Sequence, residues 1–280
     1  MITVLRLLAL AAALSQPKPA GVPAAALVAA GSGTALPAAR ILLRAYASHA
    51  PAFHLEIAES IGSTGAPLAV RAGAAALGLM SRPLKPREAD ALCELSFAQD
   101  LLIVAAAPDV TTPGLTSDEL VRVFAGELRE WTEDHRPIHV LQREAGDSGS
   151  QTFAAHIPAL GPALQQALDG RRWLVLFHDA EMQEALQQTP GALGFFDLGA
   201  LRAQGLKLKV LAINGQAPSP EAFAQGRYPF AKTLAFLLRK GEALPPDLAA
   251  FIAFSRSTEG VAALSRNGYL PPPPLDAACP

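Results

Sequence analysis

The sequence has few of the residues that build metal sites or disulfide frameworks. Its 280 residues include two cysteines, Cys93 and Cys279, and six histidines. No cysteine and histidine cluster has metal-ligand spacing, so we expect no metal ion and no cofactor. The two cysteines permit one disulfide in an oxidising compartment. A buried Cys93 with a separate thiol near the C-terminus is an equal alternative.

An excess of charge of one sign is also missing. The chain has 23 lysines and arginines against 25 aspartates and glutamates, a formal net charge of -2. This balance gives no reason to expect a nucleic acid or an acidic membrane surface as a partner. The chain is 50% hydrophobic, and its length suffices for one large domain or two ordinary ones with real cores.

The apolar run near the N-terminus is too short to span a bilayer. It covers residues 7–14, follows Arg6, and has the length of the central region of a signal peptide. Small residues before Gln16 permit cleavage there. We therefore predict a signal peptide over residues 1–15, and we expect no lipid anchor because no cysteine follows the run. The alternative is a buried first strand or helix.

Three stretches pass from a predicted strand through a turn rich in glycine and hydroxyl groups into a predicted helix. They are ALVAAGSGTALPAAR, FHLEIAESIGSTGAPLAV and IHVLQREAGDSGSQTF. Alternating or continuous apolar residues predict the strands, and 3.6-residue spacing predicts the helices. The predicted strands are residues 26–30, 53–57 and 138–143; the turns of the first two stretches are residues 31–34 and 62–65; the helix of the second is residues 66–70, and that of the third begins at Ser148.

Further elements of both kinds alternate along the chain, which predicts an α/β architecture. The predicted strands are residues 101–106, 173–177, 206–213 and 228–240, the last one crossing between lobes. The predicted helices are residues 117–125, 163–168, 180–188, 248–255 and 258–267.

The hydroxyl-rich turns suggest an anion site. A helix N-terminus exposes unpaired amides and the positive end of the helix dipole, and it binds anions without a basic side chain. Arginine can add a forked pair of donors, and Arg143 and Arg82 are the candidates. The alternative for each turn, taken singly, is an ordinary helix cap.

Taken together, the motifs resemble those of the periplasmic phosphate-binding proteins that feed ABC-type phosphate importers. The matching pieces include AAGSGTALPAA, SIGSTGAPLAV, ALGLMSRPLKPREAD, QREAGDSGSQTF and AFSRSTEGVAALSRNGYLP, in the family's order. The resemblance implies a two-lobed, type II-like periplasmic-binding-protein fold, with mixed sheets flanked by helices and the ligand in the interlobe cleft. We expect one lobe from residues 22–104 with 228–280 and the other from residues 105–227.

Carried over position by position, the resemblance implies a set of phosphate-binding residues. The first two motifs supply Thr34 with the amide of Ala35, and Ser63. The fourth supplies an arginine and a hydroxyl-rich cradle, in which a serine replaces the family's final threonine. The third supplies Ser81 and Arg82. The expected set is Thr34, Ala35, Ser63, Ser81, Arg82, Arg143, Ser148, Gly149 and Ser150.

Position 81 departs from part of the family. Some members have an aspartate where this chain has Ser81, and an acceptor there rejects sulfate, which carries no proton to donate. Asp147 or Glu144 are the candidates to replace that acceptor, and Arg82 would be an added charge partner. Selectivity for phosphate over other oxyanions therefore stays open at this point.

The resemblance implies a binding protein without catalytic residues. We expect a periplasmic, monomeric protein that captures inorganic phosphate and delivers it to the membrane permease of an ABC importer. Alternatives are a receptor for sulfate, molybdate or an organic phosphate, or a sensory binding module. A more remote alternative is a serine hydrolase using Ser148, because GDSG also begins the trypsin-like motif; no upstream histidine has the matching context, and the α/β pattern disagrees with an all-β protease.

Overall fold

The protein is described by a computed structural model over residues 27–274. The predicted signal peptide and Cys279 lie outside the described residues. Within residues 27–274, no helix combines the length and the apolar character needed to cross a bilayer.

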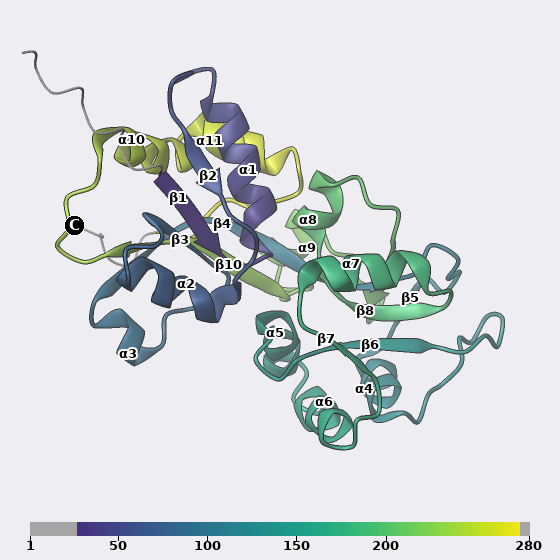
Figure 1. The fold of residues 1–280 in the computed structure, drawn as a ribbon. Helices are drawn as coiled ribbons and strands as arrows, with labels where there is room; N and C mark the ends of the chain where they lie inside the picture. The colour runs from purple at the N-terminus through teal and green to yellow at the C-terminus, as the bar shows by residue number, and fades with distance from the viewer. Residues whose placement is uncertain (1–26, 275–280) are drawn as a thin grey trace, which may run out of the picture.

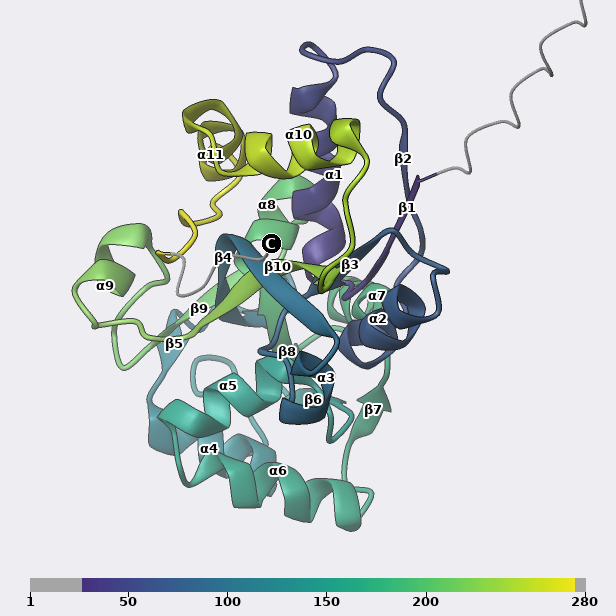
Figure 2. The same cartoon turned by 90° about the vertical axis from the view of Figure 1, so that its left-hand side faces the viewer.

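A mixed sheet of ten strands runs through the described part of the molecule, with helices on its faces (Figures 1 and 2). The main strand order is β2-β1-β3-β10-β4-β8-β6-β7, while β9 pairs with β4 and β5 pairs with β9. The strands are β1 (Leu27–Gly31), β2 (Leu55–Ile57), β3 (Leu77–Met80), β4 (Leu92–Ala106), β5 (Gly114–Leu115), β6 (His139–Arg143), β7 (Leu174–Leu176), β8 (Ala192–Asp197), β9 (Lys209–Ile213) and β10 (Ala231–Arg239).

The helices begin and end where local chemistry favours it. In α4, for example, Thr116 and Glu119 form a reciprocal capping box, and Gly126 ends the helix in the left-handed conformation, at φ 76°. The helices are α1 (Ala35–Tyr46), α2 (Gly62–Arg71), α3 (Pro86–Ala89), α4 (Ser117–Ala125), α5 (Ser148–His156), α6 (Leu160–Asp169), α7 (Asp179–Gln188), α8 (Leu198–Ala203), α9 (Pro220–Ala224), α10 (Pro246–Ser255) and α11 (Thr258–Ser265).

Buried apolar residues gather in two large clusters, which we call the first and second cores. The first core lies among β1, β3, β10, α1, α10 and α11 and includes Leu42, Leu79, Phe236 and Phe251. The second core lies among the end of β4, β6, β8 and α4 to α6 and includes Phe124, Phe153 and Phe195. Figure 1 shows the two groups of elements as separate masses, upper left and lower right.

Strand β4 belongs to both groups. Its first part, Leu92–Leu101, pairs antiparallel with β10, while Leu102–Ala106 pairs with β8. The chain therefore passes from the sheet of the first core to the sheet of the second inside one continuous strand.

The predicted fold class is confirmed: the sheet is mixed and flanked by helices. The strand predicted at residues 228–240 is β10, and the helix predicted at residues 117–125 has the bounds of α4. One turn prediction was wrong, since residues 62–65 form the first turn of α2. Gly62 alone makes the change of direction, at φ 71°, so the helix starts at once. The predicted lobe boundaries stay a prediction.

Candidate anion-binding site

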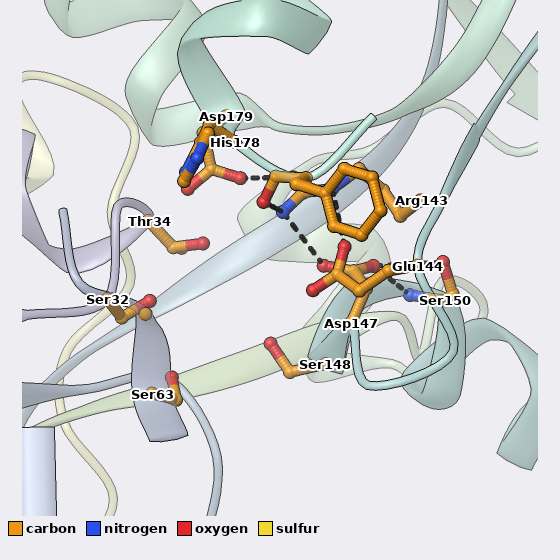
Figure 3. Close-up of polar contacts among 12 residues, drawn as sticks. Ser32, Thr34, Ser63, Arg143, Glu144, Asp147, Ser148, Ser150, His178 and Asp179 are labelled. Atoms are coloured by element: carbon orange, nitrogen blue, oxygen red, sulfur yellow. Dashed lines mark hydrogen bonds and ion pairs between the residues drawn. The ribbon is translucent and has the colours of Figure 1, made fainter. Parts of the chain in front are cut away.

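Loops from both halves of the molecule surround one cavity of about 270 Å³. Figure 3 shows Ser32, Thr34 and Ser63 on one side and Arg143, Asp147 and Ser148 on the other. Ser32 and Thr34 follow β1, and Ser63 lies in the first turn of α2. Arg143 ends β6, and Ser148 begins α5. The lining is completed by Ser60, Ile61, Ser81, Glu144, Phe177, His178 and Asp179, together with small residues between them.

A chain of hydroxyl groups crosses the floor of this cavity. The Ser81 Oγ lies 2.7 Å from the Ser32 Oγ, and 3.2 Å from both the Ser63 Oγ and the Ser148 Oγ. A hydroxyl can donate one hydrogen bond and accept two, so this chain can turn several O–H groups toward a guest. Ser63 and Ser148 also lie in the first turns of α2 and α5, where helix amides are unpaired and the dipole favours an anion.

Arg143 supplies the cavity's positive charge and is already surrounded by acceptors. Its Nη1 donates to the Asp179 carboxylate in a short contact, and its Nη2 donates to the Phe177 carbonyl at 3.0 Å. Glu144 lies 3.4 Å and Asp147 3.8 Å from the guanidinium. Burial lowers the pKa of Arg143, but the Asp147, Asp179 and Glu144 carboxylates more than offset it, so the pKa lies above its ordinary value.

Behind Thr34 lies a buried ion pair. The Lys232 Nζ is 2.8 Å from the Asp197 Oδ1, and both side chains are almost completely buried. The Thr34 hydroxyl donates to Asp197 at 3.0 Å and accepts from Lys232 at 2.9 Å. Burial alone lowers the pKa of Lys232, but the Asp197 carboxylate raises it above its ordinary value. The proton of the Thr34 hydroxyl is therefore directed away from the cavity.

The sequence matches the family model of the PBP superfamily domain over residues 18–259. The chain belongs to the PBP superfamily. Phosphate-binding protein PstS of Borreliella burgdorferi is 22% identical over 200 residues, which are 69% of this chain and 71% of that protein. Phosphate-binding protein PstS of Bacillus subtilis is 25% identical over 148 residues, which are 51% of this chain and 45% of that protein.

A solved structure supports the same superfamily fold. It is a candidate phosphate ABC transporter substrate-binding protein from Clostridium perfringens, solved with bound phosphate. The TM-score is 0.76 at 20% identity, and the match covers 88% of this chain and 99% of that chain. At this identity, the likeness describes the fold.

This PBP superfamily protein brings five of the sequence-predicted site residues to the cavity wall. They are Thr34, Ser63, Ser81, Arg143 and Ser148. Gly149 lies deeper, beside a narrow space of about 10 Å³ that Lys232 also lines.

Two other predicted residues, Ala35 and Ser150, have partners within their own loops. The Ala35 amide donates to the Ser32 carbonyl. The amide and the hydroxyl of Ser150 both donate to Asp147, at 2.7 and 2.9 Å. Asp147, one of the two acids expected to replace a missing acceptor, therefore caps α5, although it also lines the cavity.

Arg82 lies behind the cavity wall, where it supports a binding loop. Its guanidinium pairs with both oxygens of Glu88, at 2.8 and 2.9 Å, and donates to the Ser63 carbonyl at 2.9 Å. Arg82 thus connects α3 to the first turn of α2. The expected charge partner of the anion is, in this structure, a partner of Glu88.

Sequence reasoning missed Asp179, Lys232 and Asp197. Asp179 begins α7, separated by two residues from the end of the short strand β7, at another strand-to-helix junction that lacks the glycine and serine pattern. Lys232 and Asp197 each interrupt an apolar stretch, PFAKTLAF and GFFDLG. Two isolated charges of opposite sign in buried strands are a signal for an ion pair, because a lone buried charge is costly.

Among the described residues, no group of three or more histidines, cysteines, aspartates or glutamates is arranged to hold a metal ion. The Ser148 hydroxyl contacts Ser81, and in residues 27–274 it has no hydrogen bond to a histidine. The pairing that activates a nucleophilic serine is therefore not formed in this part of the chain.

Glu88 links acid stability to the support of the Ser63 loop. Its hydrogen bond with Arg82 is the largest cause that lowers its pKa from 4.5 to about 2. A carboxylate whose pKa is lowered in the folded protein stabilises the fold at any pH above its pKa in the unfolded chain. This contribution is lost as the pH falls from about 4.5 to about 2. We expect Glu88→Gln to destabilise the protein at about pH 7 by roughly 1.5–3 kcal/mol, and by less at about pH 2.5. Urea unfolding at both pH values measures this.

The control for Glu88→Gln is Asp90→Asn. Asp90 is exposed one residue after α3 and has no ion pair among the described residues. We expect its replacement to change the free energy of unfolding by no more than about 0.5 kcal/mol. An equal loss for both variants, or a Glu88→Gln loss that is the same at both pH values, would contradict the role of the Arg82 pair.

Proposed function

We propose that this protein captures inorganic phosphate and delivers it to the permease of an ABC importer. Two relatives that match it carry the name phosphate-binding protein PstS, and the Clostridium perfringens structure of the same fold holds phosphate. The observation that carries the proposal is the lining of the cavity: three hydroxyl-rich loops and one arginine, distant from one another in the sequence, lie around it.

The proposed ligand contacts are Ser63, Ser81, Arg143 and Ser148. Thr34 and Gly149 would contribute through their backbone amides, because the Thr34 hydroxyl already donates to Asp197. Arg143 supplies the charge, and the serines supply neutral donors that adapt to the ligand by rotating their hydroxyls. Ala35, Ser150 and Arg82 support the loops that carry these groups. Binding is the whole chemistry, so we propose no catalytic residue.

Other parts of the proposal concern the setting of the protein. We propose that it is exported to the periplasm, that it acts as a monomer, and that its cleft lies between lobes formed by residues 22–104 with 228–280 and by residues 105–227. The first core supports this division in part, while the second core also draws on the predicted first lobe, namely residues 101–104, Tyr228, Phe230 and Leu270. Its permease partner follows from the family of importers that such proteins serve.

A second candidate function is the binding of a different anion in the same cavity. Ser81 can act as a donor as well as an acceptor, so this position does not by itself reject sulfate, as a carboxylate there would. A receptor for sulfate, molybdate or an organic phosphate is the alternative that this observation favours.

Calorimetric titration of the mature protein with a panel of oxyanions tests the proposal. We expect one phosphate to bind per chain, and sulfate in about tenfold excess to leave it bound, because the carboxylates around Arg143 disfavour a guest without a proton. Binding of sulfate or molybdate in preference to phosphate would replace the proposed ligand. Failure of every oxyanion to bind would reject the function.

A further inference from the structure

The cavity proposed to bind an anion has more negative than positive side chains. Arg143 is the cation among its lining residues, while Glu144, Asp147 and Asp179 are carboxylates. The nearby Lys232 is matched by Asp197. An anion that enters must therefore compete with carboxylates that already lie on the arginine.

Of these carboxylates, Asp179 makes the most direct contact. It pairs with the Nη1 of Arg143 at short range, while Glu144 approaches the Nε at 3.4 Å. Asp147 lies 3.8 Å from the Nη2, and it also accepts from the amide and hydroxyl of Ser150. Asp147 thus caps α5, whereas the Asp179 carboxylate has no other hydrogen-bond partner in the described structure.

The carboxylate of Asp179 also extends toward the opposite wall of the cavity. A Cβ added to Gly33 would lie 2.0 Å from the Asp179 Oδ2, so this oxygen lies against the backbone of the loop between Ser32 and Thr34. Glycine at position 33 leaves the space that the carboxylate fills. Asp179 thus lies between Arg143 and the loop from Ser32 to Thr34, and both of these belong to the proposed site (Figure 3).

Two groups from the junction of β7 and α7 accept hydrogen bonds from the Nη atoms of Arg143, and they differ in how easily they can move away. The Phe177 carbonyl is part of the backbone, and the Phe177 amide donates to Glu181 at 2.8 Å, which fixes this turn. The Asp179 carboxylate is a side chain that can rotate away. An oxyanion that needs two donors of the arginine can gain the second one by displacing Asp179.

We propose that Asp179 is an internal competitor: its carboxylate occupies the place of a ligand oxygen on Arg143, and the anion binds by displacing it. This inference rests on the proposed function of the cavity. The apparent affinity for the anion is the intrinsic affinity multiplied by the fraction of molecules in which the Arg143–Asp179 pair is open. It also excludes weak monovalent anions, which gain less from the arginine than they must displace.

The test compares the wild type with Asp179→Asn in calorimetric titrations with inorganic phosphate. Asparagine keeps the size of the side chain and removes its charge, so phosphate no longer displaces an ion pair. We expect binding to become at least about tenfold tighter, which corresponds to a pair closed in about nine tenths or more of the unliganded molecules. Chloride and acetate, tested in parallel, should compete better with phosphate in the variant.

Glu184→Gln is the matched control. Glu184 is exposed on the same helix, α7, and its replacement removes the same charge away from the arginine. We expect its phosphate affinity to stay within about twofold of the wild type, since exposed charges are largely screened by salt.

The outcomes separate the inference from the proposed function. If the wild type binds phosphate and Asp179→Asn binds it equally or more weakly, Asp179 is a ligand contact or a bystander, and the inference is overturned while the function stands. If no variant binds any oxyanion, both are rejected. Thermal unfolding gives an independent measure. Without ligand, Asp179→Asn should unfold at a lower temperature than Glu184→Gln, because Arg143 loses its nearest counter-charge. Added phosphate should raise the unfolding temperature of Asp179→Asn by more than that of Glu184→Gln.

Discussion

Replacement of Arg143 by alanine is expected to weaken phosphate binding by about 2–5 kcal/mol. The guanidinium is the cation among the lining residues of the cavity, and its side chain is only 10% exposed, so water screens it weakly. Its loss also leaves Asp147, Asp179 and Glu144 facing the anion without a counter-charge. Calorimetric titration with phosphate measures the effect.

Arg143→Lys separates charge from geometry. Lysine keeps the charge but has no planar fork that can serve two oxygens at once, so we expect an affinity between those of the wild type and Arg143→Ala. The matched control is Arg136→Ala, since Arg136 also pairs with two aspartates, Asp109 and Asp134, but does not line the cavity. An unchanged affinity in Arg143→Ala would remove Arg143 from the site.

Replacement of Lys232 by methionine is expected to destabilise the protein by about 3–5 kcal/mol, because it leaves the Asp197 carboxylate buried without a cation. The pair is almost completely enclosed, and Thr34 depends on both partners. Urea unfolding at neutral pH measures the loss. Phosphate binding should weaken as well, since the Thr34 loop loses its anchor.

The double variant Lys232→Met with Asp197→Leu tests whether the unpaired charge is the cause. An apolar pair of similar size can replace a buried ion pair at little cost, so the double variant should recover most of the lost stability. Lys207→Met is the control, because Lys207 is exposed. A double variant as unstable as Lys232→Met alone would mean that packing, and not charge, explains the loss.

The sequence predicted the site through local patterns that repeat. Each of the three hydroxyl-rich junctions, at Thr34, Ser63 and Ser148, carries its own signal, a strand followed by small polar residues and a helical spacing. Strands β1 and β2 are parallel, so the junctions at Thr34 and Ser63 lie at the same edge of one sheet. The junction at Ser148 follows β6, which pairs with β7 and β8. Local chemistry thus predicted the parts of the site, and the family resemblance predicted that they meet.

The strands β3 and β8 were not predicted, for a local reason. In β3, Gly78 lies where an added Cβ would be 2.6 Å from Leu237, and in β8, Gly194 lies where it would be 2.8 Å from Met182. Both glycines are needed for close packing, yet glycine in a short segment weakens the sequence pattern of a strand. Tertiary contacts that no local window contains decide these two elements.

Asp179, Lys232 and the role of Arg82 depend on partners far along the chain. Arg143 and Asp179 are 36 residues apart, and Lys232 and Thr34 are 198 apart. The sequence predicted Arg82 as a ligand contact because it follows Ser81, and in the structure it pairs with Glu88, six residues later. The sequence around an arginine does not show which acidic residue it will pair with.

The continuity of β4 determines where the two cores are joined. Leu101 is the last residue of β4 that pairs with β10, and Leu102, the next, begins the pairing with β8. The Leu102 amide also donates to the Phe230 carbonyl, just before β10 starts. The two connections between the cores, β4 at Leu101–Leu102 and the chain at Phe230 that leads into β10, therefore lie side by side, so the cores share one narrow junction.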